Sequence, residues 1–150
     1  MMARKALIFG NAGQLGVELV REFTNRDYRV AGYDRAELDI TDGALVEDCV
    51  AQFDPGVVVN AAAYNQVDVA EKEPMPAFAV NALAVQNIAV ACRQVGARLV
   101  HYSTDYVFDG TLGRPYTEDD APRPVNAYGV SKLAGEFFAQ AYLDNPLVIR

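Results

Sequence analysis

The chain has 150 residues, of which 51% are hydrophobic and 22% are charged. These proportions are typical of one globular domain and exclude collagen-like, low-complexity and disordered chains. Twenty acidic residues against 13 basic residues give a net charge of -7, and the resulting field opposes binding to nucleic acid and to anionic membranes. We expect neither as a partner.

Targeting and redox signals are weak. The apolar run at residues 6–10 is too short for a secretory signal, and no stretch is expected to reach the ~20 apolar residues of a membrane span. Cys49 and Cys92 lie in separate amphipathic segments and are expected to be reduced, inert thiols. The default prediction is a cytoplasmic protein.

Apolar runs of strand length alternate with longer segments of helical periodicity, which predicts βαβ units and a parallel sheet. The expected strands are 5–10, 29–34, 57–60, 99–103 and 147–150. The expected helices are 15–25, 42–52, 76–95 and 126–142, with Thr41 capping the second. The predicted fold class is α/β, a doubly wound parallel sheet of the Rossmann type.

The final expected strand coincides with the end of the sequence. A parallel strand is normally followed by a crossover to another element. We therefore expect residues 1–150 to be the first half of a longer protein.

A glycine-rich run follows the first expected strand and opens the first helix. Gly10, Gly13 and Gly16 occur in the strand–turn–helix context that a dinucleotide fingerprint requires. Glycines permit the tight turn and let main-chain N–H groups reach a pyrophosphate at the helix N-terminus. The expected cofactor contacts here are Gly10, Asn11, Gly13, Gln14, Leu15 and Gly16.

The end of the second strand bears on the choice of cofactor. Asp34 is placed to accept a hydrogen bond from an adenosine ribose hydroxyl, which favours NAD, whereas Arg35 could pair with the 2′-phosphate of NADP. The cofactor is thus NADPH or NADH, with the preference open. Asp39 and Ile40 are expected to border the adenine, although a solvated loop acid explains Asp39 equally well.

Small side chains follow the next strand at its carboxyl end, where open α/β sheets bind ligands. Asn60, Ala61, Ala62 and Ala63 are therefore candidate cofactor contacts. Close packing of the strand end against a helix would explain the alanines equally well.

Tyr128 and Lys132 are four residues apart on an expected helix and so share one face. An ammonium beside a phenol favours the phenolate, which predicts a lowered pKa for Tyr128 and its use as a general acid. Alone, the pair is equally well explained by a surface tyrosine and an exposed lysine. Together with the glycine run and a hydroxyl-rich strand end, we interpret it as catalytic.

That strand end supplies Thr104, whose hydroxyl is expected to bind a carbonyl oxygen as negative charge builds on it. Asn81 lies in mid-helix, where asparagine is unfavourable, and its amide is interpreted as spent on local hydrogen bonds or a water relay. His101 is expected to be a packed strand residue rather than a catalyst. The spacing of His, Cys and carboxylates predicts no metal site.

Together these motifs resemble the extended short-chain dehydrogenases/reductases and, within them, the dTDP-4-dehydrorhamnose reductase family. The resemblance spans about residues 5–150; its most specific part is the string from Ser103 to Phe108. It implies an NAD(P)-dependent oxidoreductase of nucleotide-sugar metabolism with two domains. Residues 1–150 would form the NAD(P)-binding domain, and the smaller substrate domain of the family would be absent from this chain. In that family NADPH or NADH reduces the 4-keto group of a dTDP-6-deoxy sugar to give dTDP-L-rhamnose.

Carried over by position, the resemblance implies that Thr104 orients the carbonyl and that Tyr128 donates the proton. Lys132 would tune Tyr128 and bind the nicotinamide ribose, and Tyr128 would also contact the cofactor. The implied substrate contacts are Val67, Thr104, Asp105 and Tyr106. A nucleotide sugar is the implied substrate, and a homodimer is an implied assembly.

Two features depart from the family pattern. Asn65 stands where the family usually has threonine. Glu18 matches a magnesium ligand of some members, but the other ligands would lie beyond Arg150, so no metal is expected.

The same motifs bear on three other functions. Dehydratases of the superfamily carry an acid–base glutamate where Tyr106 stands, which argues against that activity, and an epimerase is no better supported. A non-catalytic NAD(P)-binding subunit, similar to the regulatory subunit of methionine adenosyltransferase, is the remaining alternative. The intact Tyr128–Lys132 pair argues against it.

Overall fold

A computed structural model describes residues 4–150 and contains one five-stranded sheet. The strands are β1 (Lys5–Phe9), β2 (Arg29–Tyr33), β3 (Val57–Asn60), β4 (Arg98–Tyr102) and β5 (Leu147–Ile149). All neighbouring strands pair in parallel, in the order β2-β1-β3-β4-β5. The chain therefore changes direction across the sheet between β1 and β3, which confirms the doubly wound α/β prediction.

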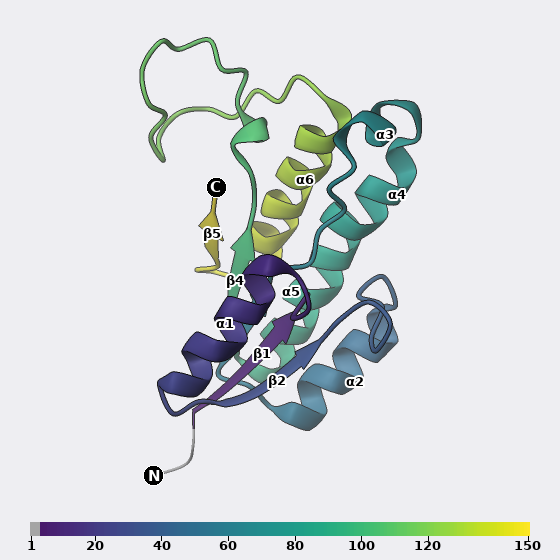
Figure 1. The fold of residues 1–150 in the computed structure, drawn as a ribbon, viewed down its shortest axis with the longest axis vertical. Coiled ribbons are helices and arrows are strands. Elements are labelled where there is room, and N and C mark those ends of the chain that lie inside the picture. Colours follow the sequence, from purple (N-terminus) through teal and green to yellow (C-terminus); the bar gives the residue numbers. More distant parts are fainter. Residues whose placement is uncertain (1–3) are drawn as a thin grey trace.

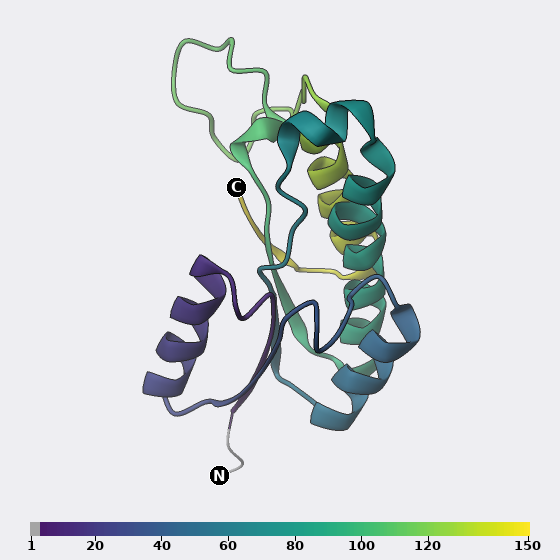
Figure 2. The same ribbon diagram turned by 45° about the vertical axis from the view of Figure 1, so that its right-hand side comes forward.

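Helices cover the two faces of the sheet unequally. The long helices are α1 (Gln14–Asn25), α2 (Gly43–Phe53), α5 (Ala84–Val95) and α6 (Ala127–Tyr142). Figures 1 and 2 show α1 on one side of the sheet and α2, α5 and α6 on the other. The main core forms on the second side, where Leu7, Phe9 and Leu99 from the strands pack with Val46 and Ile88 from the helices.

The N-terminal cap of α2 corrects one prediction. Asp42, rather than Thr41, caps the helix, because its carboxylate accepts hydrogen bonds from the main-chain N–H groups of Ala44 and Leu45. Thr41 instead donates both its N–H and its hydroxyl to the carboxylate of Asp39. The sequence offers two neighbouring residues able to cap a helix, and the competing bond to Asp39 decides between them.

The helix expected at residues 76–95 is longer and less regular than predicted. It begins as α4 (Pro74–Phe78), continues through the π-helical turn η1 (Ala79–Leu83) and ends as α5. Two short elements were not predicted: α3 (Val67–Lys72) and the 3-10 turn η2 (Asp105–Val107). Each is too short for a helical periodicity to show in the sequence.

The continuous helix Pro74–Val95 also corrects the expectation about apolar segments. Its 22 residues include a window with a mean hydropathy of 1.5, so by length and composition it is able to span a membrane. Half of that window is buried inside the domain. Its C-terminal part, α5, packs against α2, α6 and the sheet, which accounts for the apolar composition as that of a core helix.

His101 and Asn60 form a buried polar pair between β4 and β3. They are register partners in the sheet, both fully buried, with 3.2 Å between Asn60 Nδ2 and His101 Nδ1. His101 Nε2 has no hydrogen-bond partner among the described residues. Burial, aided by the nearby charge of Lys132, lowers the pKa of His101 from 6.5 to about 3. The imidazole is therefore neutral and packed, as the sequence led us to expect.

This burial predicts a loss of stability in mild acid. Between pH 6.5 and about 3 the unfolded chain binds a proton on His101 that the folded chain does not bind. The stability contribution is thus complete above pH 6.5 and falls by about 1.4 kcal/mol per pH unit as the pH decreases. Urea unfolding at pH 6.5 and pH 5 is expected to differ by about 2 kcal/mol for this reason.

The matched variant is His101→Gln, whose amide is able to face Asn60 but does not titrate. Because the chain has one histidine, this variant is expected to lose most of the difference between pH 6.5 and pH 5. Equal pH dependence in the variant and the parent would show that His101 is not the acid-sensitive group.

Candidate active site

The turn between β1 and α1 is built on glycines that the fold itself requires. Gly10 has φ +83°, and a Cβ there would lie 2.7 Å from the main-chain nitrogen of Ala62. A Cβ at Gly16 would lie 2.0 Å from the carbonyl oxygen of Gly10. Close packing of the turn against α1 and the end of β3 therefore explains both residues without any ligand.

Gly13 is different, because no contact with the described part of the chain demands a glycine there. Its φ is -73°, and the nearest atom to an added Cβ would be at 3.5 Å, an ordinary contact. Gly13 precedes α1 as the N-cap position, and no side chain of the described residues caps that helix. The first-turn N–H groups of α1 are consequently available to an anion, and Gly13 keeps the approach to them open.

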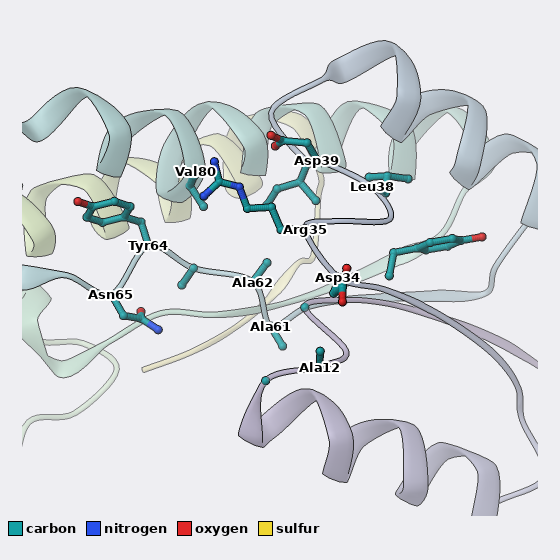
Figure 3. A pocket seen from close by; sticks show the side chains of 15 residues that line it. Ala12, Asp34, Arg35, Leu38, Asp39, Ala61, Ala62, Tyr64, Asn65 and Val80 are labelled. Atoms are coloured by element: carbon teal, nitrogen blue, oxygen red, sulfur yellow. The ribbon is translucent and has the colours of Figure 1, made fainter.

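A cleft of about 310 Å³ lies beside this turn at the carboxyl ends of β1, β2 and β3 (Figure 3). Its walls hold many of the predicted cofactor contacts: Gly10, Gly13, Asp34, Arg35, Asp39, Ile40, Ala61, Ala62 and Ala63. They also hold residues that we did not predict as cofactor contacts: Ala12, Tyr33, Leu38, Tyr64, Asn65 and Val80. The alanines do not fill the cleft, so small side chains after β3 leave room for a ligand.

Several predicted cofactor contacts lie outside the cleft walls. Asn60 is fully buried and accepts a hydrogen bond from the N–H of Ala62. It therefore stabilises the turn after β3 rather than lining the cleft. Asn11 packs against Gly32, where an added Cβ would lie 2.8 Å from the Asn11 Cβ. Of the others, Gln14, Leu15 and Gly16 belong to the first turn of α1, and Tyr128 and Lys132 lie on α6.

The end of β2 carries groups for a ribose or a phosphate. The Oδ1 of Asp34 accepts hydrogen bonds from the N–H groups of Ala36 and Glu37, at 2.8 and 3.1 Å, which closes a turn and fixes the carboxylate. In Figure 3 Asp34 lies on the side of the Ala12 turn, whereas Arg35 extends toward the opposite wall. Asp34 is therefore placed to bind the ribose of NAD, and Arg35 is placed to bind the 2′-phosphate of NADP.

Tyr128 and Lys132 both lie buried on α6, as their spacing predicts, but they are not arranged as the sequence suggested. The Lys132 Nζ donates to the main-chain oxygen of Tyr102 at 2.6 Å, and burial lowers the pKa of Lys132 to about 8. Burial raises the pKa of Tyr128 above 10, while the hydroxyl of Thr104 acts in the opposite direction. The predicted lowering of the Tyr128 pKa by the ammonium is thus not observed, because the lysine chain extends to β4.

Tyr128 lies where the cleft meets the end of β4. Its hydroxyl is 3.5 Å from Oδ1 of Asn65, which also lines the cleft. The ring of Tyr106 packs edge-on against the ring of Tyr128, with 5.6 Å between centroids. Gly129 allows this approach, since a Cβ there would lie 2.3 Å from the carbonyl oxygen of Tyr106.

Thr104 and its neighbours complete this end of the site. The Oγ1 of Thr104 accepts a hydrogen bond from the N–H of Tyr106 at 3.2 Å and so begins the 3-10 turn η2. Asp105 lies in that turn, and Tyr106 is partly exposed. Val67, at the start of α3, is half-buried and packs in a small apolar cluster with Tyr128. Thr104, Tyr106, Val67 and Tyr128 therefore gather in one region.

Asn81 ties the cleft to α6. Its Oδ1 accepts from the N–H of Tyr64 at 2.8 Å, and its Nδ2 donates to the oxygen of Tyr64 and to the hydroxyl of Ser131, both at 3.0 Å. The amide is spent on hydrogen bonds, as interpreted from the sequence, but its partners are 17 and 50 residues away rather than local.

Metal and thiol chemistry find no support among residues 4–150. No group of three or more His, Cys, Asp or Glu side chains there is placed to hold a metal ion. Glu18 is exposed and pairs with Arg21 one turn further along α1. Both cysteines are free, and burial raises the pKa of Cys92 to about 12, which makes it a poor nucleophile.

Comparisons with known proteins agree with this architecture. A family model described as RmlD substrate binding domain matches residues 4–150. The chain is 50% identical over 130 residues to a dTDP-4-dehydrorhamnose reductase of Streptomyces griseus, which covers 87% of this chain and 43% of the relative. It is 42% identical to the Escherichia coli K12 enzyme of the same name, covering 96% of this chain and 49% of that enzyme.

Solved structures give the same result. A dTDP-4-dehydrorhamnose reductase from Bacillus anthracis in complex with NADP is 40% identical and superimposes with a TM-score of 0.94, over 98% of this chain and 52% of that chain. A UDP-glucose 4-epimerase from Thermus thermophilus complexed with NAD is 30% identical with a TM-score of 0.84, over 92% and 50%. The chain spans about half the length of the curated relatives it matches.

Proposed function

The chain belongs to the RmlD substrate binding domain family, and from that membership we propose that it forms the NAD(P)-binding part of a two-domain sugar-nucleotide reductase. The reaction is reduction of the 4-keto group of a dTDP-6-deoxy sugar to give dTDP-L-rhamnose. The observation that carries the proposal is the position of Tyr128, whose hydroxyl lies beside Asn65 at the edge of the cleft and near Thr104. Lys132 lies one turn further along α6, bound to the end of β4. The cleft begins at a glycine-lined helix N-terminus that no described side chain caps.

The cleft fits a dinucleotide. The open position at Gly13 and the uncapped N–H groups of α1 suit a pyrophosphate, and Asp34 or Arg35 suits the adenosine ribose or its phosphate. Once bound, the reduced nicotinamide would supply the hydride. Lys132 would hold the nicotinamide ribose from α6.

The remaining groups serve the carbonyl. Tyr128, kept protonated at neutral pH by its raised pKa, would donate the proton to the developing alkoxide. The hydroxyl of Thr104 would bind the same oxygen, while Tyr106 and Asp105 would flank the sugar, with Val67 nearby. A nucleotide-sugar partner, a homodimer and a cytoplasmic location are parts of the same proposal.

The test is oxidation of the reduced cofactor by the 4-keto sugar. Addition of dTDP-6-deoxy-L-lyxo-4-hexulose is expected to lower the absorbance of NADPH or NADH, with one cofactor consumed per sugar. Sedimentation and cell fractionation check the assembly and the location. The assay uses the complete two-domain protein, because the proposed site includes both domains, and absence of turnover with both cofactors in that protein would overturn the proposal.

The structural likeness to a UDP-glucose 4-epimerase is the reason to keep a second candidate. An epimerase regenerates its cofactor, so it would interconvert sugars without net loss of NADPH absorbance. A non-catalytic binding subunit would bind the dinucleotide yet turn over no keto sugar. The same experiment, run with product analysis and a binding assay, separates all three.

A further inference from the structure

Helix α6 contacts the end of β4 through a row of three buried side chains. Tyr128, Lys132 and Glu136 are spaced four residues apart and so lie one above another on one face of the helix. Tyr128 lies near Thr104, and Lys132 donates to the carbonyl of Tyr102. The third member, Glu136, accepts a hydrogen bond from the hydroxyl of Ser103, which lies between those two residues.

Glu136 has no part in the chemistry proposed above, although it is only 1% exposed. Its carboxylate also binds the guanidinium of Arg150 through both oxygens, with 2.7 Å between Nη2 and Oε2. Arg150 follows β5 and lies 5.1 Å from the centre of the Phe108 ring. One carboxylate thus joins α6 to the ends of two neighbouring strands.

We propose that Glu136 is a positioning residue for the site, which fixes the end of β4 beneath Thr104 and places a buried negative charge one helical turn from the Lys132 side chain. The first part follows from the bond to Ser103, because Thr104 is the next residue of the chain. The second follows from the four-residue spacing on a buried helix face, where a carboxylate one turn away acts through a medium with little water.

The groups around Lys132 make Glu136 the source of the stabilising charge. Tyr128 precedes it on α6 and is neutral, and His101 on β4 is also neutral. Arg150 after β5 is cationic and is bound to Glu136 itself. Burial lowers the pKa of Lys132, and Glu136 acts against that lowering.

The experiment measures the pKa of Lys132 directly, by NMR titration of isotope-labelled lysine side chains. Glu136→Gln keeps an oxygen for the Ser103 hydroxyl but removes the charge, so it is expected to lower the pKa of Lys132 by about one pH unit. Arg150→Gln removes the competing cation and is expected to raise that pKa. Glu47→Gln neutralises a partly buried carboxylate on α2 that accepts a hydrogen bond from Gln94. It is the control and should leave the pKa of Lys132 unchanged.

The two variants are expected to shift the pKa of Lys132 in opposite directions, which distinguishes an effect of charge from a loss of local structure. Loss of local structure would move the pKa of Lys132 in the same direction in both variants, and that result would overturn the proposal. If Glu136→Gln does not fold, the Arg150→Gln variant still decides, because an unchanged or lowered pKa of Lys132 contradicts the proposal.

The catalytic consequence rests on the proposed function. In Glu136→Gln, kcat is expected to fall about tenfold with little change in KM, and the decline of activity at high pH should begin at a lower pH. If the parent protein reduces no keto sugar while the Lys132 shifts appear, the proposed function fails and the role of Glu136 stands. An active parent whose Glu136→Gln variant shows no shift overturns the role of Glu136 alone.

Discussion

Replacing Tyr128 by phenylalanine is expected to lower kcat for the keto sugar at least about 100-fold, the lower end of what a positioned general acid contributes. The change removes one hydroxyl and keeps the ring that packs against Tyr106 and Ala77. The hydroxyl contact to Asn65 is long, at 3.5 Å, so its loss is expected to cost little stability. Steady-state kinetics with saturating cofactor measures the effect.

A control on the same helix distinguishes loss of the proton donor from a general effect of removing a tyrosine hydroxyl from α6. Tyr142→Phe deletes a hydroxyl at the opposite end of α6, where it accepts a hydrogen bond from Gln86. That variant should keep its kcat. Full activity in Tyr128→Phe would remove Tyr128 from the mechanism.

Replacing Gly16 by alanine is expected to lower the free energy of unfolding by about 3 kcal/mol, the upper range of overpacking costs. Alanine is normally the better helix former by up to about 1 kcal/mol. Here its Cβ would lie 2.0 Å from the carbonyl oxygen of Gly10 and 2.7 Å from Cα of Asn11. Because both contacts are with backbone, no side-chain rotation relieves them, and the turn must move away from α1. Urea unfolding measures the loss.

Gly13→Ala is the matched control three residues earlier. Its Cβ would meet only one atom within 4 Å, at 3.5 Å, so the stability of the chain is expected to stay within about 0.5 kcal/mol of the parent. Its affinity for the dinucleotide, by contrast, should fall at least about tenfold, because the methyl group enters the cleft. Equal destabilisation by the two substitutions would contradict the distinction between a packing glycine and a cofactor glycine.

The elements that the sequence predicted well are those whose apolar residues decide their place. Residues 57–60 form a short apolar run because β3 is covered on both faces, and Gly96 ends α5 with φ +72°. The glycine run was recognisable from its strand–turn–helix context. The pattern did not show that the two glycines have different roles. The fold requires a glycine at position 16 for packing, whereas it does not require one at position 13.

The parts that escaped prediction depend on distant segments. Tyr64, Leu38 and Val80 line the cleft because three segments that are distant in the sequence meet there. Lys132 binds the carbonyl of Tyr102 rather than the phenol of Tyr128, which helical spacing alone does not decide.

The π-helical turn has a consequence for how the length of this helix varies among related chains. A π turn is equivalent to one extra residue inserted into an α-helix. Deleting that residue is therefore expected to leave the packing of the helical segments on either side unchanged. Asn81 lies in this turn, and a Cβ on Gly135 would lie 2.1 Å from its carbonyl oxygen. The extra residue in the turn Ala79–Leu83 and the glycine at position 135 of α6 are therefore expected to occur together. A chain that is one residue shorter between Ala79 and Leu83 is free to carry a larger side chain at position 135, and the two changes should be inherited together.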